Sequence, residues 1–316
     1  SLFRYNPHKL ADITFEVERS SKSINAYDAI TNVLNPNNYI MHEYVGLGHR
    51  FELFNGLYLE TNGRFHNRKS IEEYKVHTFL DDWFGQNTEP LYFATYQAFI
   101  TEITLSYTPF QRYLTEPNRK VVLGSKYPTF SLTHQKGWHG FLQSDINHDY
   151  LEFSIEQDLV LGVFGNSKYV IETGKFINTT DLRFVDSKWF RQADPYLFSN
   201  PLQSFQLLQN TLYTNDIFVE MHYTHHFNGA LVNNLPLIKK TRIRAVAGAG
   251  FLWIKENNFR QEELFAGIER IFKIGPRRRL RLGVYGIVGE SNVGNLKPEY
   301  KFSIDIIDTW KKDWTY

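Results

Sequence analysis

Apolar and polar residues alternate with a period of two along most of the chain. In residues 298–308, one face of the expected strand is apolar, with Tyr300, Phe302, Ile304 and Ile306, while the intervening positions are polar or charged. The same alternation recurs at residues 11–18, 56–66, 98–108, 151–161 and 215–227. We count about twelve such segments, near the length that a tilted membrane strand requires. The pattern predicts an all-β, antiparallel protein.

The connections between these segments fall into two kinds. Asn55-Gly56 is a hairpin signal, and Gly275-Pro276 marks a second tight break. Other connections are long and polar, at residues 19–42, 67–97, 112–127 and 178–202. Short turns on one side and long loops on the other are typical of outer-membrane β-barrels.

Alternation alone does not say whether the apolar face is buried in a core or exposed to lipid. A soluble β-sandwich or barrel shows the same period, so it remains the alternative. The chain is long for a small soluble barrel, and aromatic residues lie near the expected strand ends and the C-terminus, at Tyr150, Phe227, Trp253, Tyr300, Trp310, Trp314 and Tyr316. We therefore expect an antiparallel transmembrane β-barrel over residues 1–316.

Composition excludes several other classes. The chain is 16% aromatic, yet its mean hydropathy is −0.40 and no apolar run is long enough for a membrane helix. The balance of 35 Lys and Arg against 34 Asp and Glu gives no field that would attract nucleic acid. Because there is no Cys, disulfides, thiolate metal sites and cysteine nucleophiles are absent.

The densest group of titratable side chains lies near Glu220. His222 and His226 share one face of their expected strand with Glu220, which could hold a divalent metal. Residues four apart along a strand are separated by ~13 Å, however, which is too far for one ion. We expect these three to line the barrel lumen in a polar network, together with Arg242, Arg244 and Arg281.

The charges on the expected lumen face have both signs. A solute-selective pore usually carries a ring of one sign, so mixed signs favour a lumen joined by salt bridges and closed by loops. His139 and Ser144 lie close together in the sequence and are the candidates for a barrel hydrolase. Their spacing does not indicate a nucleophile and base, so we expect no enzyme activity, no cofactor and no metal site.

Six short stretches resemble one Gram-negative outer-membrane family, whose full-length members carry an N-terminal carboxypeptidase regulatory-like domain before a C-terminal barrel. They are YTPFQRY (107–113), PNRK (117–120), GSKYPTF (124–130), KGW (136–138), HHFNG (225–229) and LPL (235–237). The resemblance implies a C-terminal barrel domain of a longer protein in the cell outer membrane. The function of that family is largely unassigned.

The last third of the chain also resembles the closing strands of BamA-like assembly and secretion barrels, at residues 267–270, 274–276 and 280–283. In those barrels, which have about sixteen strands, a long loop before the last five strands folds into the lumen and presents an Arg-Gly-aromatic tip. Here the candidate tip is Arg183-Phe184, without the glycine. If the chain is a fragment, the resemblance implies that further strands precede it.

The resemblances imply a non-enzymatic protein that supports protein assembly, secretion or anchoring at the outer membrane. Outer-membrane lipid and lipopolysaccharide are the expected partners, with other envelope proteins or lipoproteins as possible ones and no nucleic acid. A passive or gated pore for small solutes is the alternative function, and a barrel hydrolase is the third.

Overall fold

A 13-stranded antiparallel sheet forms most of the protein. The computed structural model describes residues 1–24, 39–71, 92–208, 212–227 and 243–308. The strands of the sheet, in spatial order, are β1 (Leu2–Asn6), β2 (Ala11–Ser23), β3 (Tyr39–Phe54), β4 (Leu57–Ser70), β5 (Tyr96–Tyr107), β8 (Thr129–Gly137), β9 (Asn147–Val160), β10 (Asn166–Asp181), β13 (Phe218–His226), β14 (Ile243–Ile254), β15 (Phe259–Lys273), β16 (Arg278–Ser291) and β17 (Glu299–Asp308). The prediction of an all-β, antiparallel protein is confirmed.

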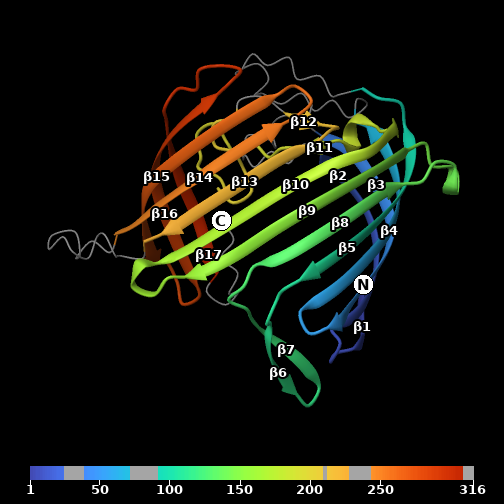
Figure 1. Ribbon diagram of the computed structural model, residues 1–316, viewed down its shortest axis with the longest axis horizontal. Helices are drawn as coiled ribbons and strands as arrows, with labels where there is room; N and C mark the ends of the chain where they lie inside the picture. The colour runs from blue at the N-terminus through green and yellow to red at the C-terminus, as the bar shows by residue number, and fades with distance from the viewer. Residues whose placement is uncertain (25–38, 72–91, 209–211, 228–242, 309–316) are drawn as a thin grey trace.

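Within the sheet, each strand pairs only with the strands before and after it in sheet order, and the whole sheet rolls up (Figure 1). In the described residues its hydrogen-bonded ladder ends at β1 on one edge and β17 on the other. Closure into a barrel therefore stays a prediction. No helix in the described part of the chain is long and apolar enough to cross a membrane.

Two small two-stranded sheets are separate from the main sheet. β6 (Arg112–Glu116) pairs with β7 (Arg119–Gly124), and this hairpin projects beyond the ends of β5 and β8 (Figure 1). The prediction of a loop over residues 112–127 is therefore wrong for most of them. The second small sheet pairs β11 (Lys188–Trp189) with β12 (Tyr213–Thr214), which are distant in the sequence, inside the rolled main sheet.

The expected division into short turns and long loops is only partly correct. Tight turns join β1 to β2, β3 to β4, β9 to β10 and β15 to β16 at one end of the sheet. At that same end, β5 and β8 are joined by the long connection that carries β6 and β7. At the opposite end, where long loops were expected, only residues 255–258 join β14 to β15.

The turn between β3 and β4 explains why the Asn55-Gly56 signal was reliable. Gly56 has a φ of +85°, which an L side chain rarely adopts. A Cβ on Gly56 would also lie 2.3 Å from the carbonyl oxygen of Thr108. Glycine is therefore required both by the turn and by the close approach of the segment after β5.

The two faces of the sheet differ sharply in polarity. We call the face turned toward the interior of the roll the inner face and the opposite one the outer face. On β17 the apolar side chains point outward, with Tyr300 78% and Ile304 69% exposed, whereas Lys301 points inward and is 1% exposed. The same arrangement holds on other strands, where the exposed outer side chains include Ile13, Phe15, Val17, Val45, Leu47, Ile103, Leu105, Leu264, Ile268, Val284 and Val288. The outer face is apolar and the inner face carries the buried charges.

Candidate functional site

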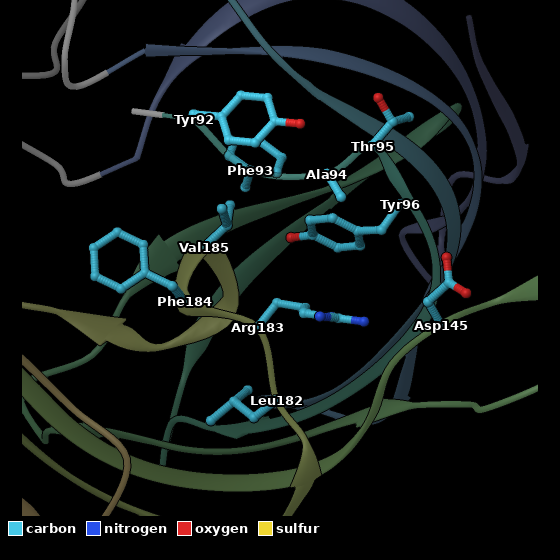
Figure 2. A pocket seen from close by; sticks show the side chains of 10 residues that line it. All are labelled: Tyr92, Phe93, Ala94, Thr95, Tyr96, Asp145, Leu182, Arg183, Phe184 and Val185. Atoms are coloured by element: carbon cyan, nitrogen blue, oxygen red, sulfur yellow. The ribbon is translucent and has the colours of Figure 1, made fainter. Parts of the chain in front are cut away.

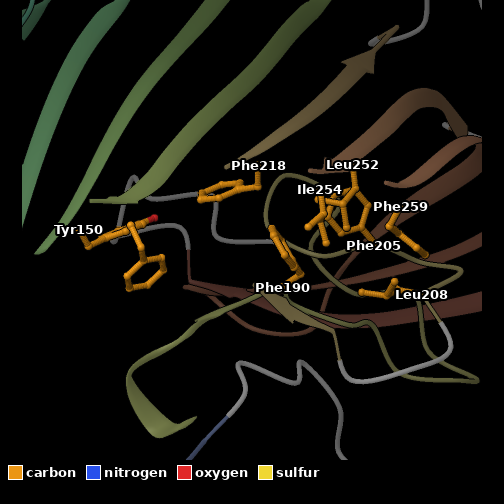
Figure 3. Packing of buried hydrophobic residues seen from close by; sticks show 9 residues of the cluster. Tyr150, Phe190, Phe205, Leu208, Phe218, Leu252, Ile254 and Phe259 are labelled. Atoms are coloured by element: carbon orange, nitrogen blue, oxygen red, sulfur yellow. The ribbon is translucent and has the colours of Figure 1, made fainter. Parts of the chain in front are cut away.

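The described part of the connection between β10 and β13 lies inside the rolled sheet. We call residues 182–208 and 212–217 the inner segment; it contains the short helix η6 (Phe184–Asp186), β11 and β12. From this segment, Phe190, Phe205 and Leu208 are all 5% exposed or less. Figure 3 shows them packed against apolar side chains that β9, β13, β14 and β15 turn inward, namely Tyr150, Phe218, Leu252, Ile254 and Phe259. This cluster of buried apolar side chains is thus formed between the sheet and its own inner segment.

A second apolar contact lies farther along the inner segment. The ring of Phe198 stacks on Tyr285 of β16, with 3.6 Å between ring centres and 6° between planes. The backbone of the same stretch pairs with β17, because Phe198 N donates to Phe302 O at 2.7 Å and Phe302 N donates to Tyr196 O at 3.2 Å. The inner segment therefore occupies part of the sheet edge at β17.

Lys188 is the central charged anchor of the inner segment. Its Nζ lies 3.0 Å from Glu152, 3.1 Å from Glu172 and 3.1 Å from Glu220, and its side chain is 18% exposed. Burial disfavours the ammonium, but Glu220, Glu152 and Glu172 together raise the pKa of Lys188 well above its ordinary value. Lys188 therefore stays charged and ties the inner segment to β9, β10 and β13.

A second ion pair holds the start of the inner segment. The guanidinium of Arg68, on β4, pairs with Asp186, and both side chains are less than 10% exposed. Arg68 also donates to the hydroxyl of Tyr96 at 2.9 Å, and that hydroxyl donates to Asp186 at 3.2 Å. Two strands far from β10 in the sheet, β4 and β5, are thereby joined to η6.

Main-chain groups of the inner segment are bound by two buried charges of the sheet. Glu263 accepts hydrogen bonds from the backbone N–H groups of Gln206 at 2.8 Å and Leu207 at 2.9 Å. Lys301 donates to the carbonyl oxygens of Asp194 at 2.7 Å and Gln206 at 2.5 Å. Because Glu263 and Lys301 are 3% and 1% exposed, these bonds replace the water that both charges lost on folding.

The residues predicted to line the lumen lie on the inner face where they are described. Glu220 contacts Lys188, and the ring of His222 lies 4.5 Å from that of Phe205. His226 Nδ1 is 3.8 Å from Glu269, and Arg281 pairs with Asp305 at 2.8 Å. Arg244 follows the inward alternation of β14 and is exposed near the start of the strand, whereas Arg242 lies outside the described residues.

The candidates for other chemistry occupy separate places. Among the described residues, no group of three or more His, Cys, Asp and Glu side chains could hold a metal ion. His139 lies 3.9 Å from Asp181 at Nδ1. Ser144 is 2% exposed, and its hydroxyl oxygen accepts a hydrogen bond from the backbone N–H of Phe99 at 3.0 Å. Ser144 thus has a structural partner of its own.

Arg183 and Phe184, the predicted tip, do not form the deepest contact of the inner segment. Both are exposed; Arg183 lies over the ring of Tyr96 at 5.7 Å, and Phe184 packs on Trp189 at 4.6 Å and Tyr213 at 5.2 Å. The buried ionic anchors are Asp186 and Lys188, which follow within a few residues. Sequence reasoning missed both.

Comparison with known proteins identifies a family for this chain, and the function of that family is unknown. No curated protein matches the chain. Residues 2–268 match the C-terminal domain of a family of unknown function, DUF5686. That span runs from β1 into β15 and includes the whole inner segment. The chain therefore belongs to the DUF5686 family, as its C-terminal domain.

Proposed function

We propose that this chain is an integral outer-membrane β-barrel that is closed internally by its inner segment and has no enzyme activity. The polarity of the sheet carries the proposal. A soluble barrel buries its apolar face, whereas here the apolar side chains face outward and the charged ones inward, as a bilayer requires. An exposed apolar surface spread over most of a sheet is far larger than soluble monomers tolerate.

The task proposed for this barrel is protein assembly, secretion or anchoring at the outer membrane. In the described part of the chain, five strands of the main sheet, β13 to β17, follow the inner segment, which is the arrangement that the BamA-like resemblance implies. The inner segment also packs inside the sheet, as the corresponding loop does in those barrels. This chain departs from them in its anchors, because Arg68–Asp186 and Lys188 hold the segment and no Arg-Gly-aromatic tip is present. The proposed task rests on this similarity of architecture.

The first test is electrophoretic migration of the detergent-folded protein with and without boiling. We expect the unboiled protein to migrate faster than the boiled one, because a closed barrel with every inner strand paired resists cold detergent. The boiled sample is the internal control for the unfolded chain. Identical migration, together with solubility in detergent-free buffer, would contradict the membrane barrel and favour a soluble all-β protein.

Planar-bilayer conductance separates a closed barrel from the alternative, a passive or gated pore. We expect silence or rare flickering from the native chain, because the inner segment is held by buried ion pairs and a hydrophobic core. A variant with residues 184–208 replaced by a short Gly-Ser linker should conduct in stable steps. Stable steps of similar size from the native chain would favour the pore.

A further inference from the structure

A cavity of about 540 Å³ lies where the inner segment begins. One wall is the stretch that leads into β5, residues 92–96, and the other is residues 182–185 of the inner segment. Figure 2 shows Arg183 and Val185 of the inner segment facing Phe93 and Tyr96, with Asp145 at the side of the cavity. This volume lies within the range of sites that bind small molecules.

Arg183 supplies the positive charge of this cavity. Its guanidinium lies 5.7 Å from the centre of the Tyr96 ring (Figure 2), and in the described part of the chain no carboxylate is in ion-pair contact with it. The nearby Arg68 is different, because Asp186 neutralises it and Tyr96 fixes it. Arg183 is therefore available to an external anion, and its planar guanidinium suits a carboxylate or a phosphate.

Aromatic rings form the walls around that charge. Tyr92, Phe93, Tyr96 and Phe184 all line the cavity, and Phe93 meets Tyr96 edge-on at 5.8 Å. Tyr96 is 5% exposed and is held in place by Arg68 and Asp186, so it backs the cavity wall, whereas Tyr92 and Phe184 are 72% and 42% exposed and offer the accessible ring surface. Flat apolar surfaces of this kind bury the apolar face of a ring-shaped ligand.

Asp145 further restricts the chemical class of ligand that the cavity can bind. Its Oδ2 accepts a hydrogen bond from the backbone of Gln97 at 3.0 Å, which fixes the carboxylate beside the cavity. A carboxylate repels a purely anionic ligand and accepts hydrogen bonds from hydroxyl groups. The ligand must then combine an acidic group for Arg183, hydroxyl donors for Asp145 and a ring face for the aromatic side chains.

We infer that this cavity binds a saccharide that carries a carboxylate or phosphate group. A fatty acid lacks the hydroxyl donors, and a neutral sugar leaves Arg183 without a counter-charge. The inference goes beyond the proposed function, since the cavity is formed by local contacts whether or not the sheet closes in a membrane. A ligand that touches both walls would also hold the inner segment against β5, because binding to the docked state stabilises it.

Isothermal titration calorimetry on the full chain in detergent tests this site with trigalacturonate, and with the neutral trisaccharide galactotriose as the matched ligand. We expect trigalacturonate to bind and galactotriose to bind more weakly. Arg183→Gln should weaken trigalacturonate binding about 10- to 100-fold, the loss typical of a charge-assisted hydrogen bond. Arg191→Gln is the control, since Arg191 lies on the same segment, outside the cavity, and donates to Gln203 at 2.7 Å.

A second titration with lipopolysaccharide that carries phosphorylated core sugars distinguishes a free saccharide from a lipid-anchored one. Binding of either probe that depends on Arg183 supports the inference and identifies the source. Unchanged β-sheet circular dichroism must accompany each variant, so that a loss of binding reports on the site and not on folding. The inference is overturned if neither probe binds, or if Arg183→Gln and Arg191→Gln bind equally well.

Discussion

Lys188→Met is expected to destabilise the folded chain by about 3 to 5 kcal/mol, the usual cost of removing one partner from a buried ionic network. Methionine keeps most of the side-chain volume but removes the ammonium that lies within 3.1 Å of Glu152, Glu172 and Glu220. Those three carboxylates then face one another without a counter-charge. The measurement is the free energy of unfolding in urea, with the protein in lipid vesicles.

Two further variants show whether charge is the cause. Lys168→Met, on β10, removes an ammonium that lies 3.7 Å from Asp158 with both side chains more than a third exposed, so it should cost less than about 1 kcal/mol. Adding Glu220→Gln to Lys188→Met should restore part of the lost stability, because one uncompensated charge is removed. Equal losses from Lys188→Met and Lys168→Met would mean that the inner segment is not held by this network.

The strands could be predicted because each one is regular over many residues. Alternation located β17 within a residue of its observed start, and it assigned Tyr300 and Lys301 to opposite faces. The hairpin of β6 and β7 escaped because each strand is only five or six residues long and is surrounded by proline and polar residues. β1, with five residues, was missed for the same reason. Short strands provide too few alternating positions to stand out from a loop.

The candidate site could be predicted only in part, because alternation is a property of one strand and the site joins several. Glu220 and His222 could be placed on one face, but that Glu220 lies directly opposite Glu172 depends on the register of β10 and β13. Two carboxylates in opposed positions need a cation between them. That cation, Lys188, comes from a stretch with no regular period.

Long-range pairs leave even less trace in a sequence. Arg68 and Asp186 are 118 residues apart, and neither belongs to a motif that suggests the other. Arg183 and Phe184, which the resemblance to BamA-like barrels indicates, lie in the inner segment but are not the residues that anchor it. Both residues instead line the cavity at the start of the segment, where Arg183 lies over the ring of Tyr96.

Phe15→Arg is expected to cost about 2 to 4 kcal/mol if the outer face meets lipid, whereas its neighbour Thr14→Arg should cost less than about 1 kcal/mol. Phe15 is 49% exposed on the outer face and pairs with Leu47 near the middle of β3, so an arginine there would lie deep in the bilayer. Thr14 faces inward on the same strand, where an arginine can reach the carboxylate of Glu16 and water.

The comparison of these two neighbours, measured as free energies of unfolding in vesicles, tests the orientation of the whole sheet because a shift of one residue exchanges its faces. A soluble protein would give the opposite order, since a charge on a water-exposed face costs little and one on the inner face displaces packed groups. Equal losses of unfolding free energy, or a larger loss for Thr14→Arg, would therefore contradict the proposal that the sheet spans a membrane. The contacts that anchor the inner segment do not depend on this result.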